Sequence, residues 1–77
     1  MKKIKLRMKK IILTTHAKKR MMERKIKLEE ITETINFPDY VISKDNKIEP
    51  HKKINSKNIK IVYTEDKFIK IITVIIK

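Results

Sequence analysis

The chain of 77 residues contains no cysteine, no glycine and no tryptophan. Without cysteine, it has neither a disulfide framework nor a thiolate zinc site. Without glycine, it cannot form the Gly-rich phosphate loops or the dinucleotide fingerprint, because both need backbone without a Cβ close to the phosphate. Nucleotide-binding enzymes of those classes are therefore excluded, and the turns must be made by other residues, such as Asn and Asp.

Histidines and long apolar runs are scarce as well. His16 and His51 are the two histidines, far apart in the chain and without any cysteine, so they give no metal-binding signature. We expect neither a metal nor a cofactor. No segment approaches the roughly 18 uncharged apolar residues of a membrane span, and the N-terminus lacks the apolar core of a signal peptide. These absences predict a cytoplasmic protein that does not enter a membrane.

Positive charge, by contrast, is abundant. Twenty-one Lys and Arg stand against nine Asp and Glu, which gives a formal net charge of +12. Such a balance favours polyanionic partners, namely RNA, DNA, an acidic protein or an anionic membrane surface. An AT-rich genome or growth at high temperature would also raise the Lys content, so composition does not choose among these explanations.

The N-terminal third predicts two helices. Residues 1–9 alternate apolar and basic side chains, which is typical of a half-buried strand or a flexible basic arm. Residues 11–13 lead into a first helix that Thr14 or Thr15 can cap and that continues to Arg24. Apolar residues at helical spacing predict a second helix over 28–36, which Pro38 ends.

The remainder predicts strands. From Tyr40 onward the chain is rich in β-branched and aromatic residues, with Asn, Asp and Ser between the runs. We place the strands at Tyr40–Lys44, Lys47–Ile54, 59–64 and 68–76. A two-residue turn at 65–66 would set Tyr63 opposite Phe68.

These elements predict a single α+β domain over residues 1–77. Residues 1–9 would form the N-terminal strand or arm, and residues 10–77 an αα-ββββ core. The expected architecture has two layers, with two N-terminal helices packed on one face of a three- to four-stranded antiparallel sheet. The last strand is apolar on both faces, so its second face is open to a partner.

The first helix aligns basic side chains. His16, Arg20 and Arg24 fall at i, i+4 and i+8 on one stripe, and Ala17 and Met21 form the adjacent apolar stripe. Like charges at this spacing repel weakly, which favours a nearby anion such as phosphate. The alternatives are a solvated basic face, or pairing of Arg20 or Arg24 with the acidic second helix.

The sequence also resembles a known family. Thr15-His16-Ala17, Arg20-Met21 and Arg24, followed by an acidic helix, Asn36-Phe37-Pro38-Asp39 and a closing Ile-Ile-Thr-Val-Ile-Ile, are similar to the domain of unknown function 4258 family over roughly residues 10–77. The chain departs from the family pattern at Lys25, where a helix-ending Gly is usual, and at Lys27, where a Ser or Thr cap is common.

The resemblance implies a fold and an activity. The family is thought to belong with the RelE/ParE and barnase/colicin-like toxin domains, so it implies a RelE-like two-layer domain that acts as a metal-independent endoribonuclease by 2′-hydroxyl attack. It singles out His16, Arg20, Arg24 and Thr73. In this chemistry His16 would be the base, and the two arginines would hold the phosphate.

Further nucleic-acid contacts and partners follow as expectations. Candidate contacts are Lys19, His51, Lys52, Tyr63 and Thr73. Core packing is the alternative for Tyr63, and no single residue stands out as the general acid among His51, Tyr63 and the lysines. The expected partners are RNA, including ribosome-associated RNA, an acidic antitoxin and a second copy of the chain. The competing functions are a non-catalytic nucleic-acid-binding module and a protein-interaction domain that dimerises through its sheet.

Overall fold

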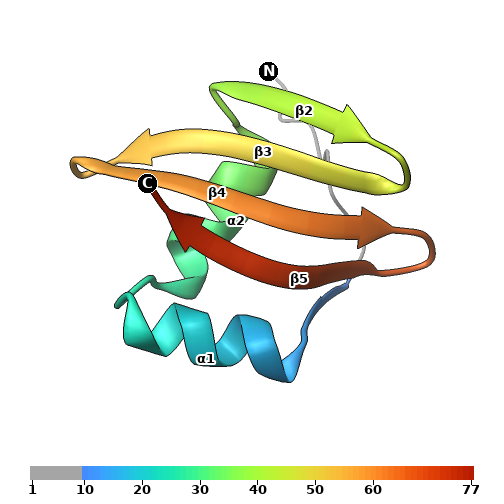
Figure 1. The fold of residues 1–77 in the computed structure, drawn as a ribbon, viewed down its shortest axis with the longest axis horizontal. Helices are drawn as coiled ribbons and strands as arrows, with labels where there is room; N and C mark the ends of the chain where they lie inside the picture. The colour runs from blue at the N-terminus through green and yellow to red at the C-terminus, as the bar shows by residue number, and fades with distance from the viewer. Residues whose placement is uncertain (1–9) are drawn as a thin grey trace, which may run out of the picture.

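The computed structural model describes residues 10–77, so the strand or arm predicted over residues 1–9 lies outside the described residues. The elements follow in the order β1 (Ile11–Leu13), α1 (Thr15–Glu23), α2 (Leu28–Asn36), β2 (Tyr40–Lys44), β3 (Lys47–Ile54), β4 (Lys57–Glu65) and β5 (Ile69–Ile76). In Figure 1, α2 lies behind the sheet and α1 lies along its β5 side. Two helices and a twisted sheet thus form the described part of the domain.

Among the described residues the sheet has five strands in the order β1-β5-β4-β3-β2, and it is mixed, with parallel and antiparallel pairs. Residues 11–13 do not simply lead into the first helix, because they form β1, which pairs in parallel with β5 from Ile11 opposite Ile69 to Leu13 opposite Ile71. The prediction of a three- to four-stranded, wholly antiparallel sheet is therefore wrong. Three apolar residues before a helix cap carry too little pattern to show that they extend a sheet edge.

The helices also differ from the predicted layer. Helix α1 packs against β5 and β1, whereas α2 packs across β3 and β4. Figure 1 shows the same division, with α1 beside the edge formed by β5 and α2 behind the middle strands. Each helix therefore covers a different part of the sheet.

Local signals define the two ends of α1. Thr14 is the N-cap, and its hydroxyl accepts a hydrogen bond from the Ala17 N–H at 3.1 Å and donates to Ile71 O at 2.9 Å. At the other end Lys25 N–H donates to Met22 O and Ile26 N–H to Met21 O, which is the Schellman arrangement. Lys25 has φ 55°, so it adopts the left-handed conformation that glycine usually supplies there. The predicted first helix is confirmed, except that Arg24 lies at its C-cap.

Helix α2 has the predicted bounds and a partly buried acidic start. The Glu30 carboxylate accepts the Lys27 N–H at 2.9 Å and pairs with Lys57 Nζ at 3.2 Å. The Lys27 backbone bond lowers the pKa of Glu30; burial opposes this and the Lys57 amine reinforces it. The acidic helix was predicted to pair with Arg20 or Arg24. Instead, Glu30 of α2 pairs with Lys57, and Arg20 pairs with Glu23 of its own helix at 3.4 Å.

Asn, Asp and Ser take the left-handed positions in the turns of the sheet. Asn55 and Ser56 have φ 50° and 69°, and they join β3 to β4 where Ile54 pairs with Lys57. Positive φ at both central residues is typical of a type I′ turn. Asp45, with φ 56°, starts the turn between β2 and β3. Because the β3–β4 turn has only two residues, β4 begins at Lys57, two residues before the predicted start.

The β4–β5 hairpin has a different register from the predicted one. Tyr63 pairs with Ile71, not Phe68, and Glu65 pairs with Ile69. A register shift between Val62 and Tyr63 leaves Ile72 as the extra residue on β5, which is a β-bulge. The connecting turn therefore spans 66–68 instead of 65–66.

The helices and the sheet enclose an aliphatic core. Its fully buried members include Ala17 from α1, Ile31 from α2, Ile61 and Tyr63 from β4, and Val74 from β5. No helix in residues 10–77 has the length and apolar character needed to cross a membrane. Within residues 10–77, no helix covers the opposite face of the sheet.

Candidate functional site

The predicted helix residues lie together on the surface of α1. His16 and Lys19 are exposed, and Arg20 has a side chain that is 40% exposed. Ala17 is fully buried on the adjacent stripe of the helix, so the basic residues lie beside the buried face and extend from it into solvent. We call His16, Lys19, Arg20 and Arg24 the α1 ridge. Because Arg24 lies at the C-cap, with φ −100° and ψ 5°, it continues the ridge beyond the last helical turn.

Arg20 is the centre of the contacts on the ridge. Its Nε donates to His16 Nε2 at 3.5 Å, and its Nη1 lies 3.4 Å from Glu23 Oε1. Glu23 offsets one positive charge, so the ridge keeps a net positive charge.

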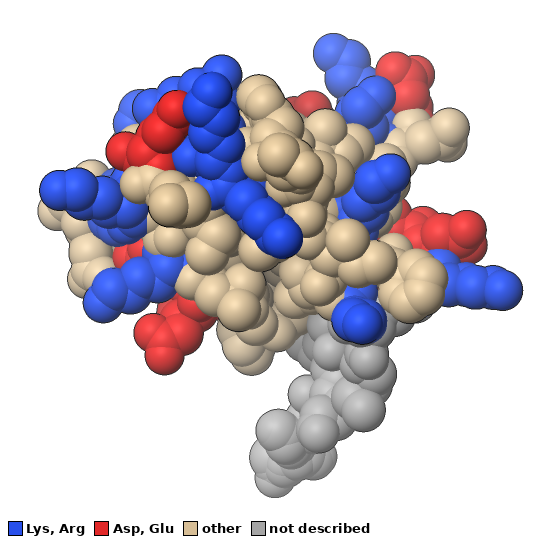
Figure 2. Space-filling model, turned by 90° about the horizontal axis from the view of Figure 1, so that it is seen from below, with Lys and Arg blue, Asp and Glu red and all other residues tan. Residues whose placement is uncertain are grey.

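The surface around α1 carries charges of both signs. Figure 2 views the molecule from the α1 side and shows Lys and Arg side chains around an uncharged central area, with Asp and Glu among them. Positive charge on this side is distributed over separate projections and is not concentrated in one groove. A polyanion would therefore meet the ridge as a convex surface, not as a closed site.

The other candidate contacts lie on the sheet and do not join the ridge. Thr73 is half-buried on β5 and pairs with Val62. Lys52 is half-buried on β3, and its Nζ lies 3.6 Å from Asp39 Oδ1. Tyr63 is 1% exposed in the core, so its ring is not available to stack on a base, and the alternative of core packing is the correct one.

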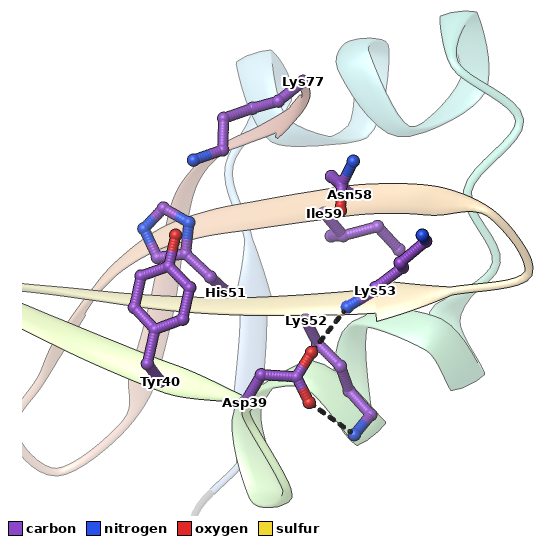
Figure 3. Close-up of a pocket in the computed structure, with 8 residues that line it drawn as sticks. All are labelled: Asp39, Tyr40, His51, Lys52, Lys53, Asn58, Ile59 and Lys77. Atoms are coloured by element: carbon purple, nitrogen blue, oxygen red, sulfur yellow. Dashed lines mark hydrogen bonds and ion pairs between the residues drawn. The ribbon is translucent and has the colours of Figure 1, made fainter.

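His51 lies in a pocket at one end of the sheet. The pocket has a volume of about 270 Å³ and is lined by Asp39, Tyr40, His51, Lys52, Lys53, Asn58, Ile59 and Lys77. We call it the His51 pocket. Its lining comes from the beginnings of β2 and β4, the second half of β3 and the residue that follows β5. Figure 3 shows the Tyr40 ring against the His51 ring, with the Lys77 side chain extending toward it.

The environment of His51 disfavours its charged form. The ring is 5% exposed, and it stacks on Tyr40 with ring centroids 4.4 Å apart and an interplanar angle of 11°. Burial lowers the pKa of His51, and the nearby positive charges of Lys77 and Lys60 lower it further. Glu49 raises it, but Glu49 is already paired with Lys60 at 3.4 Å. The imidazole is therefore held neutral.

The ridge and the His51 pocket are two separate places. Helix α1 packs against β5 and β1, whereas His51 is on β3, and β4 lies between β3 and β5. The structure thus does not unite His16 and His51 as base and acid of one catalytic centre. Within residues 10–77, no three His, Asp or Glu side chains are grouped as a metal site would require.

Sequence reasoning missed most of the His51 pocket. It named His51 and Lys52 but not Tyr40, Asn58 or Lys77. One signal was present: a two-residue turn at 45–46 pairs Lys44 with Lys47 and hence Tyr40 with His51, as the structure shows. The approach of Asn58 and Lys77 depends on strand pairing across the sheet, for which the local sequence gives no comparable sign.

Comparisons with known proteins give one finding. A family model described as Domain of unknown function (DUF4258) matches residues 13–76. No curated protein and no solved structure shows significant similarity to the chain.

Proposed function

The chain belongs to the family described as Domain of unknown function (DUF4258), and we propose that this domain binds RNA through the α1 ridge. The observation that carries the proposal is that His16, Lys19 and Arg20 reach solvent on one side of α1. Glu23 is the carboxylate that pairs with Arg20 there. Exposed guanidinium and ammonium groups bind phosphate by charge-assisted hydrogen bonds. The formal charge of +12 adds long-range attraction to any polyanion.

The test is a titration of a fluorescently labelled single-stranded RNA with the protein, followed by anisotropy at several salt concentrations. For single strands the slope of log affinity against log salt is about −0.7 per phosphate contact. We expect Arg20→Gln to weaken binding and to make the slope shallower by about 0.7, since one contact is lost.

Lys44→Gln is the matched control for charge. Lys44 is exposed on β2, at the opposite edge of the sheet from β1 and α1, and its substitution removes the same charge. It should leave the salt slope nearly unchanged. Equal slopes for Arg20→Gln and Lys44→Gln would mean that binding depends on net charge alone and would contradict a ridge-specific site.

RNA cleavage without a metal is a second candidate function. It is favoured by the contact between Arg20 Nε and His16 Nε2, because an imidazole can accept the 2′-hydroxyl proton and a guanidinium can stabilise the negative charge on the phosphate. In EDTA, the wild type would then release products with cyclic phosphate ends, and His16→Ala would release none. Cleavage by His16→Ala at the wild-type rate would exclude His16 as the base.

The kinship with RelE/ParE-type toxin domains, which the resemblance implies, adds an inhibitory partner to this proposal. An acidic antitoxin would compete with RNA for the α1 ridge. Its affinity should fall for Arg20→Gln and persist for Lys44→Gln, which isothermal calorimetry with a candidate partner would measure. Retention of full affinity by Arg20→Gln would place the partner elsewhere.

A further inference from the structure

The His51 pocket contains a buried histidine with unused hydrogen-bonding capacity. His51 is only 5% exposed. Among residues 10–77, neither Nδ1 nor Nε2 of its ring has a hydrogen-bond partner. A neutral imidazole carries one N–H donor and one acceptor, and a buried polar group without a partner destabilises a fold. The ring therefore has a donor that no described group uses, and it lies just beneath the lining of the pocket.

The charged groups of the lining leave an excess of positive charge. One carboxylate, Asp39, faces three lysines, Lys52, Lys53 and Lys77. Asp39 is already engaged, since its Oδ1 pairs with Lys52 Nζ at 3.6 Å and its Oδ2 accepts the Lys53 N–H at 3.0 Å. Within the described part of the chain, the side-chain amines of Lys53 and Lys77 form no ion pair. Figure 3 shows both engaged oxygens of Asp39 turned toward Lys52 and Lys53.

The other lining residues suit an oxyanion. Asn58 contributes a side-chain amide on β4, and its backbone carbonyl accepts the Lys77 backbone N–H at 2.9 Å, which fixes the end of the chain beside the pocket. The Tyr40 ring covers one face of His51 and fixes the plane of the imidazole. The site thus combines a fixed, buried imidazole with the ammonium groups of Lys53 and Lys77.

We propose that the His51 pocket is a binding site for a phosphate group. The side chains of the lining carry three positive charges against one negative, and Asp39 is already paired with Lys52, so the ammonium groups of Lys53 and Lys77 remain to bind the oxygens of a phosphate. A volume of about 270 Å³ accommodates this group with room for part of the molecule that bears it. The inference goes beyond the proposed function, because a site on the sheet can bind phosphate whether or not the α1 ridge binds RNA.

The bound anion should change the protonation of His51. The groups that face the ring are Tyr40 from β2, Glu49 from β3, Lys60 from β4 and Lys77 beyond β5. Burial and the lysines hold the pKa of His51 low, and a phosphate would offset the charge of the lysines. The pKa of His51 should therefore rise when the site is filled.

The experiment follows the ring resonances of His51 by NMR during titration with inorganic phosphate at constant ionic strength. We expect a saturable change in the wild type, together with a higher His51 pKa at saturation. Lys77→Gln should weaken this binding roughly tenfold, as expected for loss of one charge-assisted contact. Lys67→Gln removes an exposed lysine in the β4–β5 turn, outside the lining, and should bind phosphate as the wild type does.

Three further ligands distinguish the source of the phosphate. If a nucleoside monophosphate binds more tightly than inorganic phosphate, and the nucleoside without phosphate does not bind, the natural ligand is a small nucleotide. A short RNA that binds more tightly than both, with the same His51 response, would indicate a phosphate of RNA.

Two results would overturn the inference. One is the absence of a saturable His51 response to phosphate and to both phosphorylated ligands. The other is an equal response in Lys77→Gln and the wild type. This comparison needs no substitution of the buried His51. Lys77→Gln keeps the backbone hydrogen bond from Lys77 N–H to Asn58 O, so the variant should fold as the wild type does.

Discussion

The two histidines of the chain lie in opposite surroundings, and each marks one candidate site. His16 is exposed on the α1 ridge, in contact with a guanidinium that solvent also reaches. His51 is 5% exposed, between the Tyr40 ring and the charges of Lys60 and Lys77. Water and salt screen the ridge, whereas the His51 ring is shielded from solvent and feels the neighbouring charges of Lys60 and Lys77 more strongly. The ridge therefore suits salt-sensitive contact with a long polyanion, and the pocket suits one tightly held group.

The two sites also differ in how they are built. The ridge comes from one short helix, while the pocket combines four segments of the sheet. The pocket should consequently depend on the global fold and the ridge on the ends of α1. The following predictions test this difference, from the largest expected effect to the smallest.

Tyr63 supports the sheet on which the pocket is formed. Its side chain is 1% exposed, so Tyr63→Ala should lower the free energy of unfolding by about 3–5 kcal/mol, as large-to-small core substitutions do. Phe68 is 48% exposed, and Phe68→Ala should cost less than about 1 kcal/mol. Urea denaturation measures both variants. Similar losses for the two would show that Tyr63 is not in the core.

The Glu30–Lys57 pair should matter more than the Arg20–Glu23 pair. The Glu30 carboxylate accepts the Lys27 N–H and its side chain is 10% exposed, so Glu30→Gln should cost about 1.5–3 kcal/mol at pH 7. Glu23→Gln, in a pair that is 40% and 46% exposed, should cost less than about 0.5 kcal/mol.

The same pair should make stability depend on pH. The folded pKa of Glu30 is lowered from 4.5, so its contribution is present above that pH and is lost as the pH falls below it. Between pH 5 and strong acid, the free energy of unfolding should fall more for the wild type than for Glu30→Gln. Urea denaturation at each pH measures both profiles. Parallel profiles would show that Glu30 contributes nothing.

Lys25 tests the end of the ridge helix. It holds φ 55°, which costs a residue with a Cβ about 1 kcal/mol, so Lys25→Gly should stabilise the protein by about that amount. Lys25→Ala keeps the Cβ and should give no such gain, which separates backbone conformation from the loss of charge. Equal thermal stability of the two variants would argue against the left-handed conformation.

His51 should give a smaller, pH-dependent effect. Its pKa is lower in the folded chain than the ordinary value of 6.5, so the unfolded state binds the proton first as the pH falls. Stability linked to His51 is present above pH 6.5 and declines below it. His51→Gln should flatten that part of the profile of unfolding free energy against pH. An unchanged slope would mean that His51 titrates alike in both states.

The sequence predicts the helices because their signals are local. Thr14 as a cap and Pro38 after the second helix define ends that need no distant contact. The sheet was predicted less well, because β1 has only three residues and the bulge at Ile72 shifts the β4–β5 register. Both features depend on pairing with distant strands, and neither leaves a periodic pattern.

The candidate sites follow the same rule. The alignment of His16 with Arg20 follows from helical spacing and was predictable, although Arg24 falls at the C-cap. The contact of Tyr40 with His51 follows from the turn at 45–46, but the approach of Lys77 needs the complete sheet order. The local sequence thus predicts the α1 ridge, whereas the His51 pocket is revealed only by the fold.

The most direct test of the account is an amide NMR map of the protein with a short single-stranded RNA. If α1 is the RNA-binding element, the largest salt-sensitive shifts should lie on residues 15–24, and Arg20→Gln should reduce them while Lys44→Gln does not. Shifts confined to β2 and the turn at 45–46, with residues 15–24 unchanged at saturation, would contradict the assignment of RNA binding to the α1 ridge.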